Sequence, residues 1–164
     1  GDEVGRSQGG NNNTWCQNNS LGWMNWNQSD QDLELFEFLK TLIRIRKNLS
    51  DFINPGKYSI KEELPKVIWH GTNIEEPDWS SWSHTVAFSI NDGSPVLWCG
   101  LNAYRKNIKF CLPKSKSKWL KVIDTAVYAN KKPKQITGQS IELESRSAVL
   151  IVTNEIYKSN NQTY

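Results

Sequence analysis

Residues 84–99 decide the fold, and they read HTVAFSINDGSPVLWC. In the first half, apolar side chains at 86, 88 and 90 alternate with smaller ones, which is typical of a strand with one buried face. The turn signal Asn91-Asp92-Gly93 follows. The continuous apolar run Val96-Leu97-Trp98-Cys99 then indicates a central strand. Two strands joined by a tight turn predict antiparallel pairing.

Short segments of the same kind continue toward the C-terminus. Ile108, Phe110 and Leu112 alternate with polar residues, and 148–152 form a second continuous apolar run. We expect strands at 66–70, 84–91, 95–103, 106–112, 118–124, 140–144 and 147–154. Seven short strands within about 90 residues predict an antiparallel β-sandwich. We expect residues 155–164 to form a frayed tail.

One helix is predicted ahead of the strands, over residues 31–48. Ser29 and Asp30 offer an N-cap, and Asp32 suits the first turn. One apolar stripe recurs at helical spacing: Leu35, Phe36, Leu39, Leu42 and Ile43, with Leu49 beyond. The fold class is therefore mainly β, an antiparallel β-sandwich preceded by one α-helix.

The composition is that of a soluble globular domain, with 37% hydrophobic residues and a net charge of +3. No stretch is apolar enough to span a membrane. Three cysteines, Cys16, Cys99 and Cys111, lack disulfide or metal spacing, which favours free thiols in a reducing cytoplasm. The two histidines, His70 and His84, form no metal motif, so we expect neither metal nor cofactor.

Basic residues gather between 105 and 134, without a recognised nucleic-acid motif. Lysines on the edges of strands account for them, since they also block edge-to-edge pairing. We therefore expect no nucleic-acid partner.

The first 26 residues, GDEVGRSQGGNNNTWCQNNSLGWMNW, interleave side-chain amides with indoles. Such a segment has almost no aliphatic residues to bury, yet it is too distinctive for a linker. Amides hydrogen-bond hydroxyl groups, and indoles stack on the apolar faces of sugar rings. The composition of this segment favours the wall of a sugar-binding cleft.

The same run resembles the bacterial glycogen debranching enzymes of the isoamylase type, in glycoside hydrolase family 13 of the α-amylase superfamily. The resemblance rests on G-D-E-x-G-R-x-Q-x-G-N-N-N with the following C-Q-x-N and W-x-x-W. It continues more loosely through Val67-Ile68-Trp69-His70-Gly71, Glu76-Pro77-Asp78-Trp79-Ser80 and the strand at 146–152. Because the chain opens inside a motif, we expect it to be a piece of a longer protein.

The resemblance implies two parts. Residues 1–56 would be the last loop and last helix of a catalytic (β/α)₈ barrel, and residues 57–164 a C-terminal β-sandwich domain. Retaining glycoside hydrolysis needs two closely spaced carboxyl groups. In this superfamily these lie on earlier barrel strands, so no catalytic residue is expected here and the fragment alone should be inactive.

Substrate contact is the role that remains. The candidates for lining the α-glucan cleft are Asn11, Asn12, Asn13, Trp15, Gln17 and Asn19. The alternative is that the asparagines merely cap turns. A second pair, Trp79 and Trp82, suggests a sugar platform on the sandwich, although packing against the barrel is the interpretation we favour for it.

Two functions follow from these features. The first is the C-terminal part of an α-1,6-glucosidase that debranches glycogen or another α-glucan, working with the barrel in cis. The alternative is a carbohydrate-binding β-sandwich module that docks α-glucan by itself.

Overall fold

The computed structural model describes residues 2–27, 29–50, 65–127 and 132–158. A short 3₁₀ turn, η1 (Asp2–Val4), and one long helix, α1 (Asp30–Asn48), precede the strands. The strands and the last helix are β1 (Lys66–His70), β2 (Thr85–Asn91), β3 (Pro95–Asn102), β4 (Ile108–Cys111), β5 (Trp119–Asp124), β6 (Lys134–Gln135), β7 (Ser140–Leu143), β8 (Ser147–Thr153) and α3 (Asn154–Lys158).

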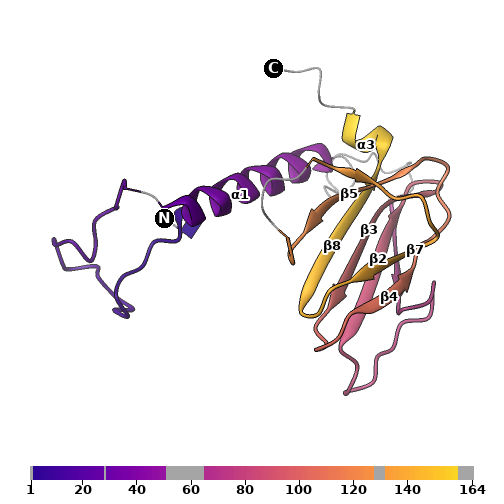
Figure 1. Ribbon diagram of the computed structural model, residues 1–164, viewed down its shortest axis with the longest axis horizontal. Helices are drawn as coiled ribbons and strands as arrows, with labels where there is room; N and C mark the ends of the chain where they lie inside the picture. The colour runs from indigo at the N-terminus through magenta and orange to yellow at the C-terminus, as the bar shows by residue number, and fades with distance from the viewer. Residues whose placement is uncertain (1, 28, 51–64, 128–131, 159–164) are drawn as a thin grey trace, which may run out of the picture.

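The strands form two antiparallel sheets (Figure 1). The large sheet has the order β1-β2-β3-β8-β5-β6, and β4 pairs with β7 in the small one. The two continuous apolar runs lie in β3 and β8, which are neighbours at the centre of the large sheet, where Trp98 lies opposite Ile151. The predicted sandwich and its central strands are therefore confirmed.

One face of the large sheet packs against the small sheet. Trp98 and Phe110 meet edge to face with ring centroids 5.8 Å apart, and neither is exposed. Trp98 comes from the large sheet, while Phe110 and Leu143 come from the small one. The remaining buried members of this core are Ala87, Leu112, Trp119, Val149 and Ile151.

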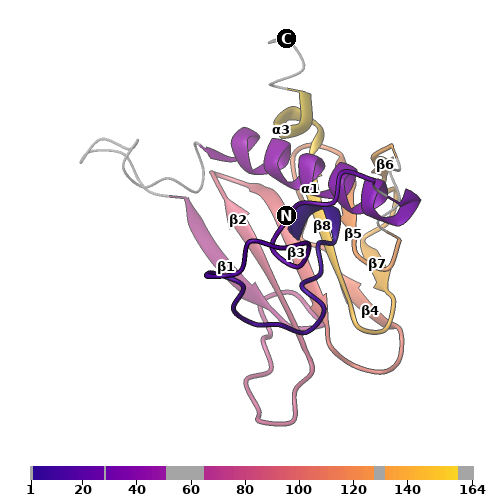
Figure 2. The same cartoon turned by 90° about the vertical axis from the view of Figure 1, so that its left-hand side faces the viewer.

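The other face of the large sheet carries the helices. Ile45 and Leu49, at the C-terminal end of α1, are buried in a second cluster together with Ile156 of α3. The strands contribute Ile90, Leu97, Ile123 and Val152. Figure 2 shows α1 crossing the upper part of this sheet, with the N-terminal loop on the same side.

The docked stripe of α1 differs from the predicted one. Phe38, Leu42, Ile45 and Leu49 form it at intervals of three and four residues, whereas Phe36 and Ile43 are exposed. Each residue turns the helix by about 100°, so a stripe shifted by one or two positions faces a different side. The helix is more broadly apolar than a single stripe requires, and the sequence alone does not show which side docks.

Two further features of the structure differ from what the sequence led us to expect. The residues expected to begin a frayed tail form α3, because Ile156 anchors them in the helix-side core. Strand β6 was not predicted, since two polar residues carry no periodicity. The proposed boundary between residues 56 and 57 lies outside the described residues.

The start of α1 is defined by a capping box. The Ser29 hydroxyl accepts a hydrogen bond from the Asp32 N–H at 3.3 Å, and the Asp32 carboxylate accepts one from the Ser29 N–H at 2.9 Å. The Ser29 N–H and the Ser29 hydroxyl, which also donates to the Asp32 carboxylate at 2.8 Å, hold the pKa of Asp32 below its usual value. The predicted N-cap is therefore present at Ser29.

A buried polar chain fixes the end of β1. The backbone N–H of Glu75 donates to His70 Nδ1 at 2.9 Å, which leaves the proton on Nε2 to reach Ser89 Oγ at 3.0 Å. Ser89 Oγ donates in turn to Asn91 Oδ1 at 2.9 Å. Burial lowers the pKa of His70, and the nearby Glu75 carboxylate partly opposes that shift.

Gly100→Ala should lower the free energy of unfolding by about 1–3 kcal/mol. A Cβ at Gly100 would lie 2.8 Å from Cζ3 of the buried Trp98 ring and closer still to Cη2. Urea denaturation followed by circular dichroism measures the change. In the control Gly138→Ala, the nearest atom to the new Cβ outside residues 137–139 is the backbone oxygen of Ser140, at an ordinary contact distance of 3.7 Å. Equal stability of the two variants would contradict this packing.

Stability should fall as the pH is lowered from about 7.5 to about 5.5, above the range in which carboxylates titrate. The unfolded chain takes up a proton at position 70 near pH 6.5, whereas the folded chain resists it, so acid favours unfolding. His70→Gln should flatten this dependence in urea titrations at several pH values, and His84→Gln should retain it. An unchanged slope in His70→Gln would show that another group is responsible.

Candidate functional site

The N-terminal loop is a series of turns held by its own asparagines. The Asn11 side-chain oxygen accepts from the Asn13 N–H at 2.9 Å, and that of Asn13 accepts from the Trp15 N–H at 3.1 Å. The Asn19 oxygen accepts from the Leu21 N–H at 3.0 Å. Each bond is an Asx turn, so the turn-capping alternative describes what these three oxygens do.

Contacts across the loop bring its ends together. Arg6 Nη2 donates to the carbonyl of Gly22 at 2.6 Å, which joins two residues that are 16 positions apart in the sequence. Between these two residues, Asn11 Nδ2 donates to Gln17 Oε1 at 3.3 Å. The loop is therefore one hydrogen-bonded unit, placed at the N-terminal end of α1 (Figure 1).

The predicted contact residues lie on the surface of this unit. Trp15 is 92% exposed, and the side chains of Asn12, Asn13, Gln17 and Asn19 are exposed too. Asn11 is half-buried, and its bond to Gln17 is the one that joins two of the predicted side chains to each other among the described residues. Since the Asx turns use the amide oxygens, the amide N–H groups of Asn13 and Asn19 point to no partner among the described residues. They are free to donate to a ligand.

The second predicted pair lies in the long loop between β1 and β2. Trp79 is 66% exposed and Trp82 is 76% exposed. The aromatic partner of Trp79 is Trp69 of β1, with ring centroids 5.5 Å apart and planes at 72°. Trp82 has no ring contact within the described part of the chain, so the two predicted members are not paired with each other.

Sequence reasoning overlooked Trp69. The segment 66–70 predicts a strand, and a tryptophan there reads as a core residue. Its side chain is 45% exposed on β1, which is an edge strand of the large sheet. The sequence feature that could have indicated a role for Trp69 is its position, because it stands directly before a loop that holds two further tryptophans.

The cysteines are free thiols in different settings. Cys16 is exposed, and burial raises the pKa of Cys99 to about 11, which makes its thiol a poor nucleophile. Cys99 lies on β3 and Cys111 on β4, which belong to separate sheets.

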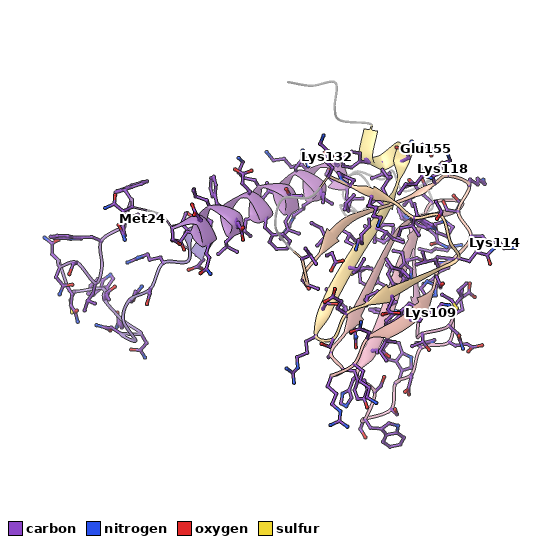
Figure 3. The ribbon with its side chains drawn as sticks, in the orientation of Figure 1. Met24, Lys109, Lys114, Lys118, Lys132 and Glu155 are labelled. Carbon is purple, nitrogen blue, oxygen red and sulfur yellow. The ribbon has the colours of Figure 1, made fainter. Side chains whose placement is uncertain are left out.

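The described residues offer no metal centre, because no three His, Cys, Asp or Glu side chains gather closely enough. Within the same ranges, neither α1 nor α3 combines the length and hydrophobicity of a membrane-spanning helix. The basic side chains Lys109, Lys114 and Lys118 lie on the opposite side of the molecule from the loop that contains Met24 (Figure 3).

Arg6→Ala should speed amide hydrogen exchange in residues 7–21 without changing the stability of the sandwich. The variant loses the bond that closes the loop, while both core clusters remain intact. Exchange measured by NMR or mass spectrometry checks this, with Lys106→Ala as a control remote from the loop. Faster exchange in β3 and β8 would contradict the independence of loop and sandwich.

Comparisons with known proteins agree on one family. A family model described as isoamylase 1-3, C-terminal, matches residues 68–160. The glycogen debranching enzyme of Pectobacterium atrosepticum is 47% identical over 116 residues, which covers 69% of this chain and 17% of that protein. The chloroplastic isoamylase SU1 of Zea mays is 30% identical over 128 residues, covering 76% of this chain and 16% of that protein.

A solved structure shares the fold. The pullulanase from Bacillus acidopullulyticus matches with a TM-score of 0.63 at 18% identity, over 93% of this chain and 18% of that one. The chain thus spans less than a fifth of the length of each of these three proteins.

Proposed function

Because the chain belongs to the isoamylase family, we propose that it is the C-terminal part of a debranching enzyme. The enzyme would hydrolyse the α-1,6 branch linkages of glycogen or a related α-glucan. The observation that carries this proposal is the match of residues 68–160, supported by 47% identity to a glycogen debranching enzyme. The similarity to a glycogen debranching enzyme favours a role in glycogen catabolism. The three free cysteines favour a reducing compartment, the cytoplasm.

The catalytic carboxyl groups lie outside this chain in the proposal. A retaining glycosidase needs a nucleophile and an acid/base about 5–5.5 Å apart. Residues 11–19 supply instead exposed amides and the Trp15 indole, groups that are suited to binding sugar and not to cleaving it. The part played by residues 11–19 is therefore substrate contact at one wall of the cleft.

Trp15 and the amides have complementary tasks in this wall. The Trp15 ring, 92% exposed, offers an apolar face for a glucose ring. The amide N–H groups of Asn13 and Asn19, on the same hydrogen-bonded unit, supply donors for hydroxyl groups. Because the Asx turns fix the backbone, the donors are pre-organised, which lowers the entropic cost of binding.

The side of α1 that faces away from the sheet, its outer side, is evidence for a barrel domain in the same chain. Leu33, Phe36 and Ile43 are exposed by 46%, 36% and 55% and recur at helical spacing. They lie away from the stripe that docks on the sheet. A helix with apolar residues on two sides suits a position between two packed bodies. We place the rest of the catalytic barrel against this outer side, with residues 1–56, α1 included, as the last part of the barrel.

In the longer protein that carries this chain, Trp15→Ala should lower kcat/KM for a branched maltodextrin about tenfold. The ring would no longer stack on the glucan, so KM should rise more than kcat falls. Reducing-end release measures both. Trp26→Ala, which removes an indole of similar exposure outside the proposed contact set, is the matched control.

The 164-residue chain alone should release no reducing ends from the same substrate. Hydrolysis by the isolated chain would overturn the assignment of the catalytic carboxyl groups to the absent part. An effect of Trp26→Ala equal to that of Trp15→Ala would overturn the specific role of Trp15.

A further inference from the structure

The loop between β1 and β2 presents aromatic rings at one end of the sandwich. Trp79 is 66% exposed and meets Trp69, itself 45% exposed, at 5.5 Å. Phe88 on β2 supports Trp69 from the sheet at 5.6 Å. The loop runs along the lower edge of Figure 1, far from the N-terminal loop. These rings are therefore separate from the proposed cleft wall.

Hydrogen bonds hold this loop in a defined shape. His70, which is buried, accepts from the Glu75 N–H at 2.9 Å, and Asn73 Nδ2 donates to Glu76 Oε2 at 2.9 Å. The Ser80 N–H donates to Asp78 Oδ1 at 3.0 Å. A surface side chain held in place before binding costs less entropy to immobilise. The loop thus carries Trp79 as a pre-organised ring.

The surroundings of the rings are polar and acidic. Glu75, Glu76 and Asp78 are exposed and lie within four residues of Trp79. Hydrogen bonds from Ser80 hold the pKa of Asp78 below its usual value, so this carboxylate is an acceptor at neutral pH. An apolar protein surface would have to strip water from these carboxylates at a cost, whereas a polyhydroxylated ligand can hydrogen-bond to them.

The angle between the rings narrows the ligand class. The planes of Trp69 and Trp79 are 72° apart, so the two cannot stack on one flat ribbon of sugar rings. A curved chain presents successive ring faces in different directions. α-1,4-Linked glucose forms such a curved chain, whereas β-1,4-linked glucose forms an extended one.

We propose that Trp79 and Trp69 form a binding site for linear α-1,4-glucan on the sandwich, separate from the cleft. The Trp79 ring stacks on one glucose unit, and the Trp69 ring borders the next. The carboxylates of the loop accept hydrogen bonds from the hydroxyl groups. The site would hold an outer chain of the polysaccharide near the enzyme without taking part in hydrolysis.

Titration of the 164-residue chain with maltotetraose, followed by the indole N–H signals in NMR, tests this site. We expect shifts of the Trp79 and Trp69 signals at millimolar sugar, and none with cellotetraose. Trp79→Ala should weaken binding at least about tenfold. Trp69→Phe should weaken it less, since a smaller ring remains over Phe88.

The matched control is Trp82→Ala, which removes an indole of similar exposure from the same loop and should leave the affinity within about twofold. Trp15→Ala separates the two sites. If Trp15→Ala abolishes binding and Trp79→Ala does not, the sugar binds at the N-terminal loop, and this proposal fails while the proposed function stands.

Two other results would overturn the site. One is the absence of any shift at Trp79 with maltotetraose in a folded chain. The other is protection of Trp79 from oxidative labelling in the longer protein without sugar, which would show that another domain covers the ring. Exposure of Trp79 there, with protection on adding maltotetraose, is the expected result. Neither result depends on hydrolytic activity.

Discussion

The pairing of β3 with β8 is the interaction on which the rest of the structure depends. Both strands carry apolar residues on both sides, so both faces of the sheet have to be covered along most of their length. Trp98 and Ile151 turn toward the small sheet, whereas Leu97 and Val152 turn toward the helices. This strand pair therefore contributes to both cores: the small sheet packs on one side of it and the helices pack on the other.

Helix α1 connects the N-terminal loop to the sandwich, and only its C-terminal part packs against the large sheet. Its C-terminal half contributes Ile45 and Leu49 to the helix-side core, while its N-terminal half projects beyond the sheet (Figure 1). The capping box at Ser29 begins the helix where the amide-rich loop ends. The loop therefore lies at the projecting end of the helix, and the undocked half of the helix separates it from the sheet (Figure 1).

The loops that carry the sugar-binding candidates obtain their order from local polar bonds. In the N-terminal loop, asparagine oxygens close successive turns and Arg6 ties the ends. In the β1–β2 loop, a buried histidine holds the backbone. In both loops, most of these hydrogen bonds join a side chain to the backbone and fix the course of the chain. The Trp15 and Trp79 rings remain exposed on the ordered loops. Two surfaces of similar chemistry thus arise from unrelated segments of one chain.

The sequence by itself determined seven of the eight strands in the described residues, the long helix, the cap at Ser29 and the family, because periodicity, turn residues and a long motif are local signals. It also indicated that residues 11–19 and the Trp79 loop are chemically suited to sugar. Only the tertiary structure decided which side of α1 docks, that α3 is ordered by Ile156, and that Trp69, not Trp82, stands beside Trp79. These depend on contacts between segments distant in the chain, whose geometry no local pattern encodes.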